Sequence, residues 1–137
     1  MPILIIVYFQ VNGIIIDLEH NIVSALGSLD TAVTLTTPED IGALTAEIVF
    51  YEPCIRNQIV YLAGDTVTYG EVANKLESVL QRTFQRREWT VPELMTELAD
   101  DQSNHIKKYR TVFAQGRGVA WEKDTSFNGL MKISLQT

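Results

Sequence analysis

The sequence predicts a mixed α/β fold, or an α+β fold, with a small, mainly parallel sheet and about four helices that dominate the C-terminal half. Short apolar runs alternate with amphipathic stretches in the order strand, helix, strand, helix, strand, which is typical of parallel crossover units. Threonine-led helix starts divide the chain, and no repeat or long linker interrupts it. We therefore expect residues 1–137 to form a single domain.

The N-terminal segment Met1–Ile16 carries no charge. Gln10 and Asn12 interrupt it before the roughly 20 apolar residues that a membrane-spanning helix needs, and it lacks the basic start and cleavage site of a signal peptide. Runs of isoleucine and valine without alternation indicate strands that are buried on both faces. We expect β pieces at Ile3–Phe9 and Gly13–Ile16, and no membrane or targeting role.

The first elements after this segment are two short strands and a helix. Asn21–Leu26 and Ala32–Thr36 have the β-branched composition of strands. Thr37 then precedes a proline and two acids, which predicts a helix from Pro38 to about Tyr51, because the threonine can cap the first turn and the acids favour its positive end.

The middle of the chain repeats this pattern. The run Gln58–Leu62 indicates a central strand that turns out through Gly64. Thr68 and Glu71 form a capping box for a second helix, and Phe84–Trp89 is the next strand candidate.

Two further helices complete the predicted elements. Thr90 and Glu93 can cap a short third helix. Ser103 or Asn104 can cap a fourth, which Gly116 can end in the left-handed conformation.

Composition limits the function. The chain has a net charge of −6 and a sequence pI near 4.8, which disfavours nucleic-acid and anionic membrane surfaces as partners. The single cysteine, Cys54, cannot form an internal disulfide, so we expect a reducing, cytoplasmic location. No histidine pair or His/Cys/acid group has ligand spacing, and we expect no metal.

Neither glycine motif predicts a cofactor site. Gly64-Asp65-Thr66 has one glycine followed by an acid that would repel a pyrophosphate, so we interpret it as a turn and helix cap. Gly116-Arg117-Gly118 follows a helix rather than a strand. Arg117 could still present its guanidinium to a carboxylate or phosphate from a loop that its glycines allow to bend.

The fourth helix carries the candidates for chemistry. His105 lies four residues before Tyr109 and therefore on the same helix face, where it could transfer a proton if a pocket opened, or it could be an exposed first-turn histidine. The same segment holds a basic cluster, which is either a partner site or a solvated face. The cluster consists of Lys107, Lys108, Arg110 and Arg117.

Three stretches together resemble the C-terminal half of fungal NmrA-like proteins, which are similar to isoflavone reductases and belong to the atypical short-chain dehydrogenases. They are PEDIGALTAEI (38–48), VYLAGDTVTY (60–69) and FAQGRGVAW (113–121). The resemblance covers about residues 13–128.

The resemblance implies a small-molecule ligand, aromatic or polyketide-like, in a cleft lined by these stretches. Tyr109, Phe113 and Trp121 are then the candidate apolar contacts and Arg117 a polar anchor, although the three aromatics could equally be core residues. Asp40 joins His105 and Tyr109 as a catalytic candidate.

The family's glycine-rich dinucleotide loop and catalytic lysine or tyrosine belong to an N-terminal half that this sequence lacks, so we expect no cofactor. Without that half, apolar strands of a doubly wound sheet would be left uncovered. Pairing of this edge with a second copy of the chain would bury them, so we expect a homodimer. The sequence indicates a ligand-binding protein that could act as a cofactor-free isomerase, cyclase or dehydratase of fungal secondary metabolism. The alternatives are a non-catalytic regulatory or interaction protein, a truncated product without function, or an NAD(P)-dependent reductase whose first half is missing through a gene-model error.

Overall fold

The computed structural model describes residues 14–135, so the predicted piece Ile3–Phe9 lies outside the described residues. The elements in chain order are β1 (Ile16–Asp17), β2 (Ile22–Leu26), β3 (Ala32–Leu35), α2 (Pro38–Val49), β4 (Asp65–Thr68), α3 (Tyr69–Leu80), β5 (Gln85–Trp89), α4 (Val91–Asp100), α5 (His105–Ala114), the 3-10 turn η1 (Lys123–Thr125) and α6 (Phe127–Leu130).

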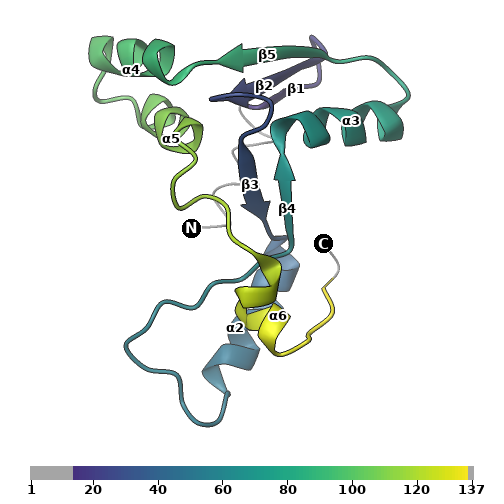
Figure 1. Cartoon of the computed structure of the whole chain (residues 1–137), viewed down its shortest axis with the longest axis vertical. Helices are drawn as coiled ribbons and strands as arrows, with labels where there is room; N and C mark the ends of the chain where they lie inside the picture. Colours follow the sequence, from purple (N-terminus) through teal and green to yellow (C-terminus); the bar gives the residue numbers. More distant parts are fainter. Residues whose placement is uncertain (1–13, 136–137) are drawn as a thin grey trace.

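These elements form two bodies joined by a ribbon (Figure 1). The upper body contains the sheet β1-β2-β5 with α3, α4 and α5, and the lower body contains α2, η1, α6 and the segment 50–64. The antiparallel pair β3–β4 connects them. The α/β class is confirmed. The three-stranded sheet is mixed rather than mainly parallel, because β2 runs parallel to β5 but antiparallel to β1.

The four expected helices are present, and their caps explain where they begin. The Thr37 hydroxyl accepts a hydrogen bond from the Asp40 N–H at 3.2 Å. The Thr68 N–H donates to the Glu71 carboxylate at 2.7 Å, and Asn104 rather than Ser103 caps α5. Local side-chain bonds to the first free N–H groups thus fix these starts.

One expected strand is wrong. Gln58–Leu62 has no strand conformation, and the strand lies a few residues later at Asp65–Thr68, where we expected a turn. The pairing with β3 determines where this strand forms. Val67 lies opposite Val33, and the hydroxyls of Thr34 and Thr66 are 2.8 Å apart. A strand needs a partner edge, and the edge of β3 is occupied by β4.

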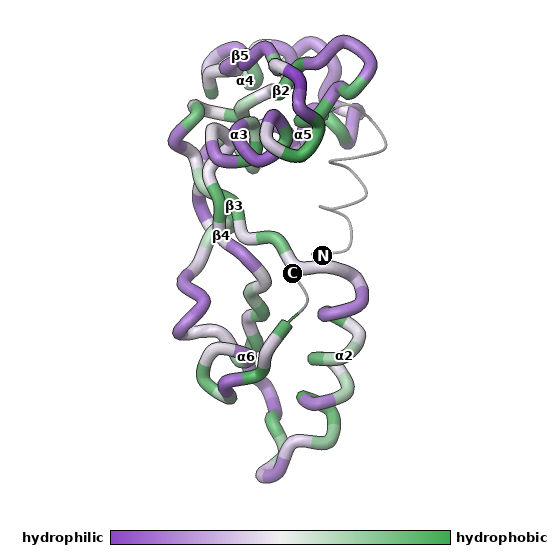
Figure 2. Tube along the Cα trace, turned by 90° about the vertical axis from the view of Figure 1, so that its right-hand side faces the viewer, coloured by the Kyte–Doolittle hydropathy of each residue, from purple (hydrophilic) through white to green (hydrophobic). Residues whose placement is uncertain are grey.

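The main core lies in the upper body and the adjoining end of the ribbon. Its members are Ile15, Val23, Ala25, Leu26, Val33, Val67, Tyr69, Ala73, Phe84, Leu94 and Ala114. The buried apolar residues of the lower body are Leu44, Ala63 and Phe127. Figure 2 shows hydrophobic segments in both bodies, including α2 and the surroundings of α6. None of the helices in residues 14–135 has the length and apolar character to cross a membrane.

Candidate functional site

Trp121 belongs to the segment between α5 and η1 and is hydrogen-bonded to both strands of the ribbon β3–β4. Its backbone N–H donates to the Thr34 hydroxyl at 2.9 Å, and its carbonyl accepts from the Thr66 hydroxyl at 3.0 Å. Its indole Nε1–H donates to the Leu62 carbonyl at 2.9 Å. Hydrogen bonds to three separate segments therefore hold this residue, and one of them is made by the indole itself, which is half-buried.

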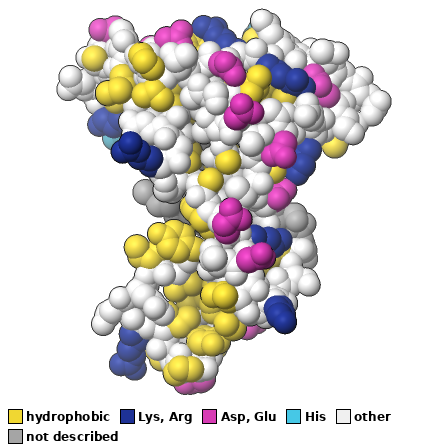
Figure 3. All heavy atoms as spheres, viewed as in Figure 1, with side chains coloured by type: hydrophobic (Ala, Val, Ile, Leu, Met, Phe, Trp, Pro, Cys, Tyr) yellow, Lys and Arg dark blue, Asp and Glu magenta, His cyan; other side chains and the backbone are white. Residues whose placement is uncertain are grey.

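Tyr61 forms the second half of this site. Its ring centroid is 5.3 Å from that of Trp121, with the planes tilted by 60°. Tyr61 is 50% exposed and its neighbour Ile59 is 79% exposed, so the ring pair borders solvent. We call Tyr61 and Trp121 the aromatic surface. In Figure 3 hydrophobic side chains gather over the lower body around η1 and α6.

The chain segment next to Tyr61 is held by Asn128, which is 1% exposed. Its side-chain amide accepts from the Ala63 N–H at 2.9 Å and donates to the Ala63 carbonyl at 2.8 Å. The Phe127 N–H donates to the Tyr61 carbonyl at 2.8 Å. These bonds attach the segment that carries Tyr61 to α6, a role that the sequence does not reveal because it joins residues far apart in the chain.

The four predicted ligand contacts lie on one continuous segment that descends from α5 to the junction (Figure 1). Phe113 packs against the upper core, as the core alternative expected for it. Tyr109 is half-buried on α5. Arg117 is exposed between Gly116 and Gly118, whose φ angles are 65° and 69°. Trp121 alone among them forms part of the aromatic surface.

The predicted catalytic residues are divided between the two bodies. His105 is the exposed first residue of α5 in the upper body, one turn before Tyr109. Asp40 is buried in the first turn of α2 in the lower body, and its carboxylate accepts from the Thr37 hydroxyl at 2.9 Å. The structure places Asp40 in a different body from the other two, and its bond with Thr37 is typical of a helix start.

Two of the four residues of the basic cluster are paired with acids of the upper body. Lys107 lies 3.6 Å from Asp101, and Arg110 lies 2.9 Å from Glu97. The Asn104 amide, which donates to Asp101, together with Ser103 and Lys107, holds the pKa of that carboxyl below its usual range. This pairing favours the solvated-face interpretation of the cluster.

The glycine segments do not fit a dinucleotide pyrophosphate. Gly64 leads into β4 rather than from a strand into a helix, and Gly116 and Gly118 follow the C-terminus of α5, where carbonyl groups repel anions. Within residues 14–135, no group of three His, Cys, Asp or Glu side chains could share a metal ion. Cys54 is an exposed free thiol.

Comparison with known proteins identifies a similar protein with a described family domain. A Gibberella moniliformis protein described as an NmrA-like family domain-containing oxidoreductase is 38% identical to this chain over 115 residues. The match covers 83% of this chain and 37% of the relative, so the chain spans little more than a third of the relative's length. No family model matches the chain, and no solved structure matches it.

The fold and its junction define a small α/β protein with an exposed aromatic surface. Over the matched residues the chain is similar to an NmrA-like family protein, as its three motif stretches indicated.

Proposed function

We propose that this chain is a ligand-binding part of an NmrA-like protein and that it holds a small aromatic or polyketide-like molecule on the aromatic surface of Tyr61 and Trp121. The observation that carries the proposal is the anchoring of Trp121, whose N–H, carbonyl and indole N–H are all hydrogen-bonded. A ring held in place before binding loses little conformational entropy when a flat ligand stacks on it.

Arg117 supports the same proposal from the segment just above Trp121. Its side chain is exposed, and the flanking glycines adopt positive φ angles that few other residues tolerate. A guanidinium there could pair with a carboxylate or phenolate of the ligand. We propose binding rather than cofactor-free catalysis, because the three catalytic candidates lie in two different bodies.

Fluorescence titration tests the proposal. In a Trp89→Phe background Trp121 is the remaining tryptophan, and 2-naphthol serves as a neutral, planar probe. We expect saturable quenching, with Tyr61→Ala weakening the affinity about 3- to 10-fold through loss of the ring contact. Phe50→Ala is the control, because Phe50 is 82% exposed at the far end of α2. Quenching that does not saturate, or that is equal in both variants, would reject the proposal.

The relative's description favours a second candidate, a contribution to an oxidoreductase. That activity would need a dinucleotide, which the glycine segments of residues 14–135 do not fit. Titration of the chain with NADPH separates the two candidates. We expect no saturable binding at micromolar concentration, and tight binding would favour the reductase.

A homodimer remains part of the proposal. Ile59, Leu130 and Met131 of the lower body are 79%, 63% and 41% exposed, an unusual density of apolar side chains for so small a body. Light scattering at micromolar concentration is expected to give the mass of two chains. A monomer mass over that range would contradict it.

A further inference from the structure

The helical hairpin of α4 and α5 in the upper body is closed along one side only. Leu94 is 1% exposed, and its carbonyl lies 3.4 Å from the Thr111 hydroxyl that donates to it. Farther along, Glu97 accepts from Arg110 at 2.9 Å. These contacts use one face of α4 and leave the neighbouring face open.

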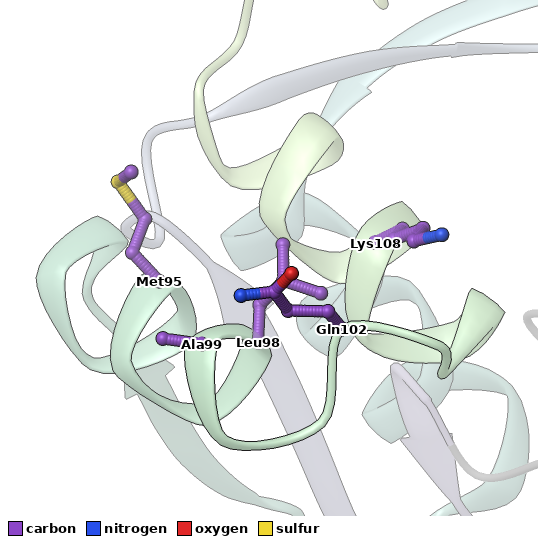
Figure 4. A pocket seen from close by; sticks show the side chains of 5 residues that line it. All are labelled: Met95, Leu98, Ala99, Gln102 and Lys108. Atoms are coloured by element: carbon purple, nitrogen blue, oxygen red, sulfur yellow. The ribbon is translucent and has the colours of Figure 1, made fainter.

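The open face has a regular pattern. Leu98 and Ala99 follow Met95 at three and four residues, the spacing that places side chains on one side of a helix, and Gln102 lies in the turn after α4. Together with Lys108 of α5 they surround a depression of about 420 Å³ (Figure 4). This volume lies within the range of small-molecule sites. Its lining combines three apolar side chains with the Gln102 amide and the Lys108 side chain.

The positive charge of Lys108 favours an anionic ligand in this depression. Lys107 and Arg110, the neighbours of Lys108 on α5, are paired with acids. No ion pair is formed by Lys108 with any residue of the described range 14–135. In Figure 4 its nitrogen points away from the other four side chains, so a bound anion would draw it inward by rotation of its four-carbon stem.

We propose that this depression is a second ligand site, separate from the aromatic surface, for a small amphipathic monoanion such as a medium-chain or aryl carboxylate. The apolar part of the ligand packs on Met95, Leu98 and Ala99. Lys108 pairs with the carboxylate, and the Gln102 amide, which stands between the two helices in Figure 4, donates a hydrogen bond to it.

Calorimetric titration with octanoate tests this site, and octylamine, which is cationic at pH 7, is the charge-reversed ligand. We expect saturable binding of octanoate and at least about tenfold weaker binding of octylamine. Lys108→Gln should weaken octanoate binding about 3- to 10-fold, a loss appropriate to an exposed charge pair. Ala99→Trp should abolish it, because Ala99 is exposed and the indole would fill the depression without entering the core.

Lys123→Gln is the matched control, since it removes the same charge from an exposed lysine of η1 in the lower body. Met95→Gln is a second apolar variant in case Ala99→Trp does not fold. Equal binding of octanoate and octylamine, or octanoate binding that survives Lys108→Gln and both apolar variants, would overturn the proposal. Tyr61→Ala should leave octanoate binding unchanged, so this site and the aromatic surface can fail separately.

Discussion

At the scale of single residues, Asn128 connects two segments of the lower body that are distant in sequence. Its amide satisfies both backbone groups of Ala63 and also accepts from the Ser126 hydroxyl at 3.0 Å. Asn128→Ala would leave the buried N–H and carbonyl of Ala63 without partners. We expect the free energy of unfolding to decrease by about 2–3 kcal/mol, measured by urea denaturation.

Asn74→Ala is the matched control for that measurement. Asn74 is exposed on α3 and, within residues 14–135, its amide oxygen accepts from Arg86 alone. We expect a decrease below about 0.5 kcal/mol. If the two variants lose the same stability, the amide of Asn128 does not hold the segment of Tyr61 in place.

Tyr69 shows the opposite situation, a buried polar atom that no described residue bonds. Its side chain is fully buried, its hydroxyl has no hydrogen-bond partner among residues 14–135, and burial raises the pKa of the phenol. Tyr69→Phe should therefore leave stability at pH 7 unchanged or raise it by up to about 1 kcal/mol.

The raised pKa of Tyr69 also fixes a dependence on pH. The folded state holds the phenol proton more tightly than the unfolded chain, whose tyrosine pKa is about 10, so stability decreases as the pH rises above that value. Urea denaturation at pH 7 and near pH 11 is expected to show a smaller alkaline loss for Tyr69→Phe than for the natural chain. The exposed Tyr61→Phe should follow the natural chain, and identical losses in all three proteins would contradict the assignment.

At the scale of elements, Gly27 sets the distance between the end of β2 and α5. Its φ is 90°, and a Cβ placed there would lie 2.5 Å from the Ala114 carbonyl oxygen. Gly27→Ala should destabilise the fold by about 2–4 kcal/mol, since both the φ angle and the backbone contact oppose it.

Gly42 is the control for Gly27, because it lies inside α2, a Cβ added there would meet nothing within 4 Å, and its φ is ordinary. Gly42→Ala should raise the stability by about 0.5–1 kcal/mol through helix propensity. The same substitution is thus expected to change the denaturation midpoint in opposite directions. Equal shifts would mean that α5 does not depend on its close approach to β2.

The elements that the sequence predicted correctly are those that local chemistry decides. The helix starts at Thr37, Thr68 and Thr90 need only side chains within three residues of the cap. The strand expected at Gln58–Leu62 failed because apolar β-branched residues do not create a partner edge, and the carbonyl of Leu62 is used instead by the Trp121 indole.

The residues of the candidate site also differ in whether the sequence alone could predict them. Trp121 could be proposed from its motif stretch, but its partner Tyr61 could not, because their contact depends on how residues 60 positions apart are brought together. Asn128 carried no sequence signal beyond a cap-like serine two residues earlier. His105 and Tyr109 share a helix face as spacing predicted, whereas the position of Asp40 relative to them depends on the arrangement of the two bodies.

At the scale of the whole molecule, the two bodies differ in how they are stabilised. The upper body buries a continuous apolar cluster under β2 and β5, whereas the buried apolar residues of the described lower body are Leu44, Ala63 and Phe127, and Asn128 connects its segments by hydrogen bonds. Buried apolar area supplies most of the stability of small folds. The lower body should therefore open at a smaller cost in free energy than the upper body.

Native-state hydrogen exchange measures this difference. We expect the amides of α2 to exchange through openings that cost at least about 2 kcal/mol less than those of β2 and β5, because local opening reflects the apolar contacts that each unit buries. Asn128→Ala should lower the opening free energy of α6 and leave that of β2 nearly unchanged, since the described partners of the Asn128 side chain lie in the lower body. A saturating aromatic ligand on Tyr61 and Trp121 should instead slow exchange in the lower body. Equal protection of α2 and β2 would show that the two bodies open as one unit, and the aromatic surface would then lie within a single cooperative fold.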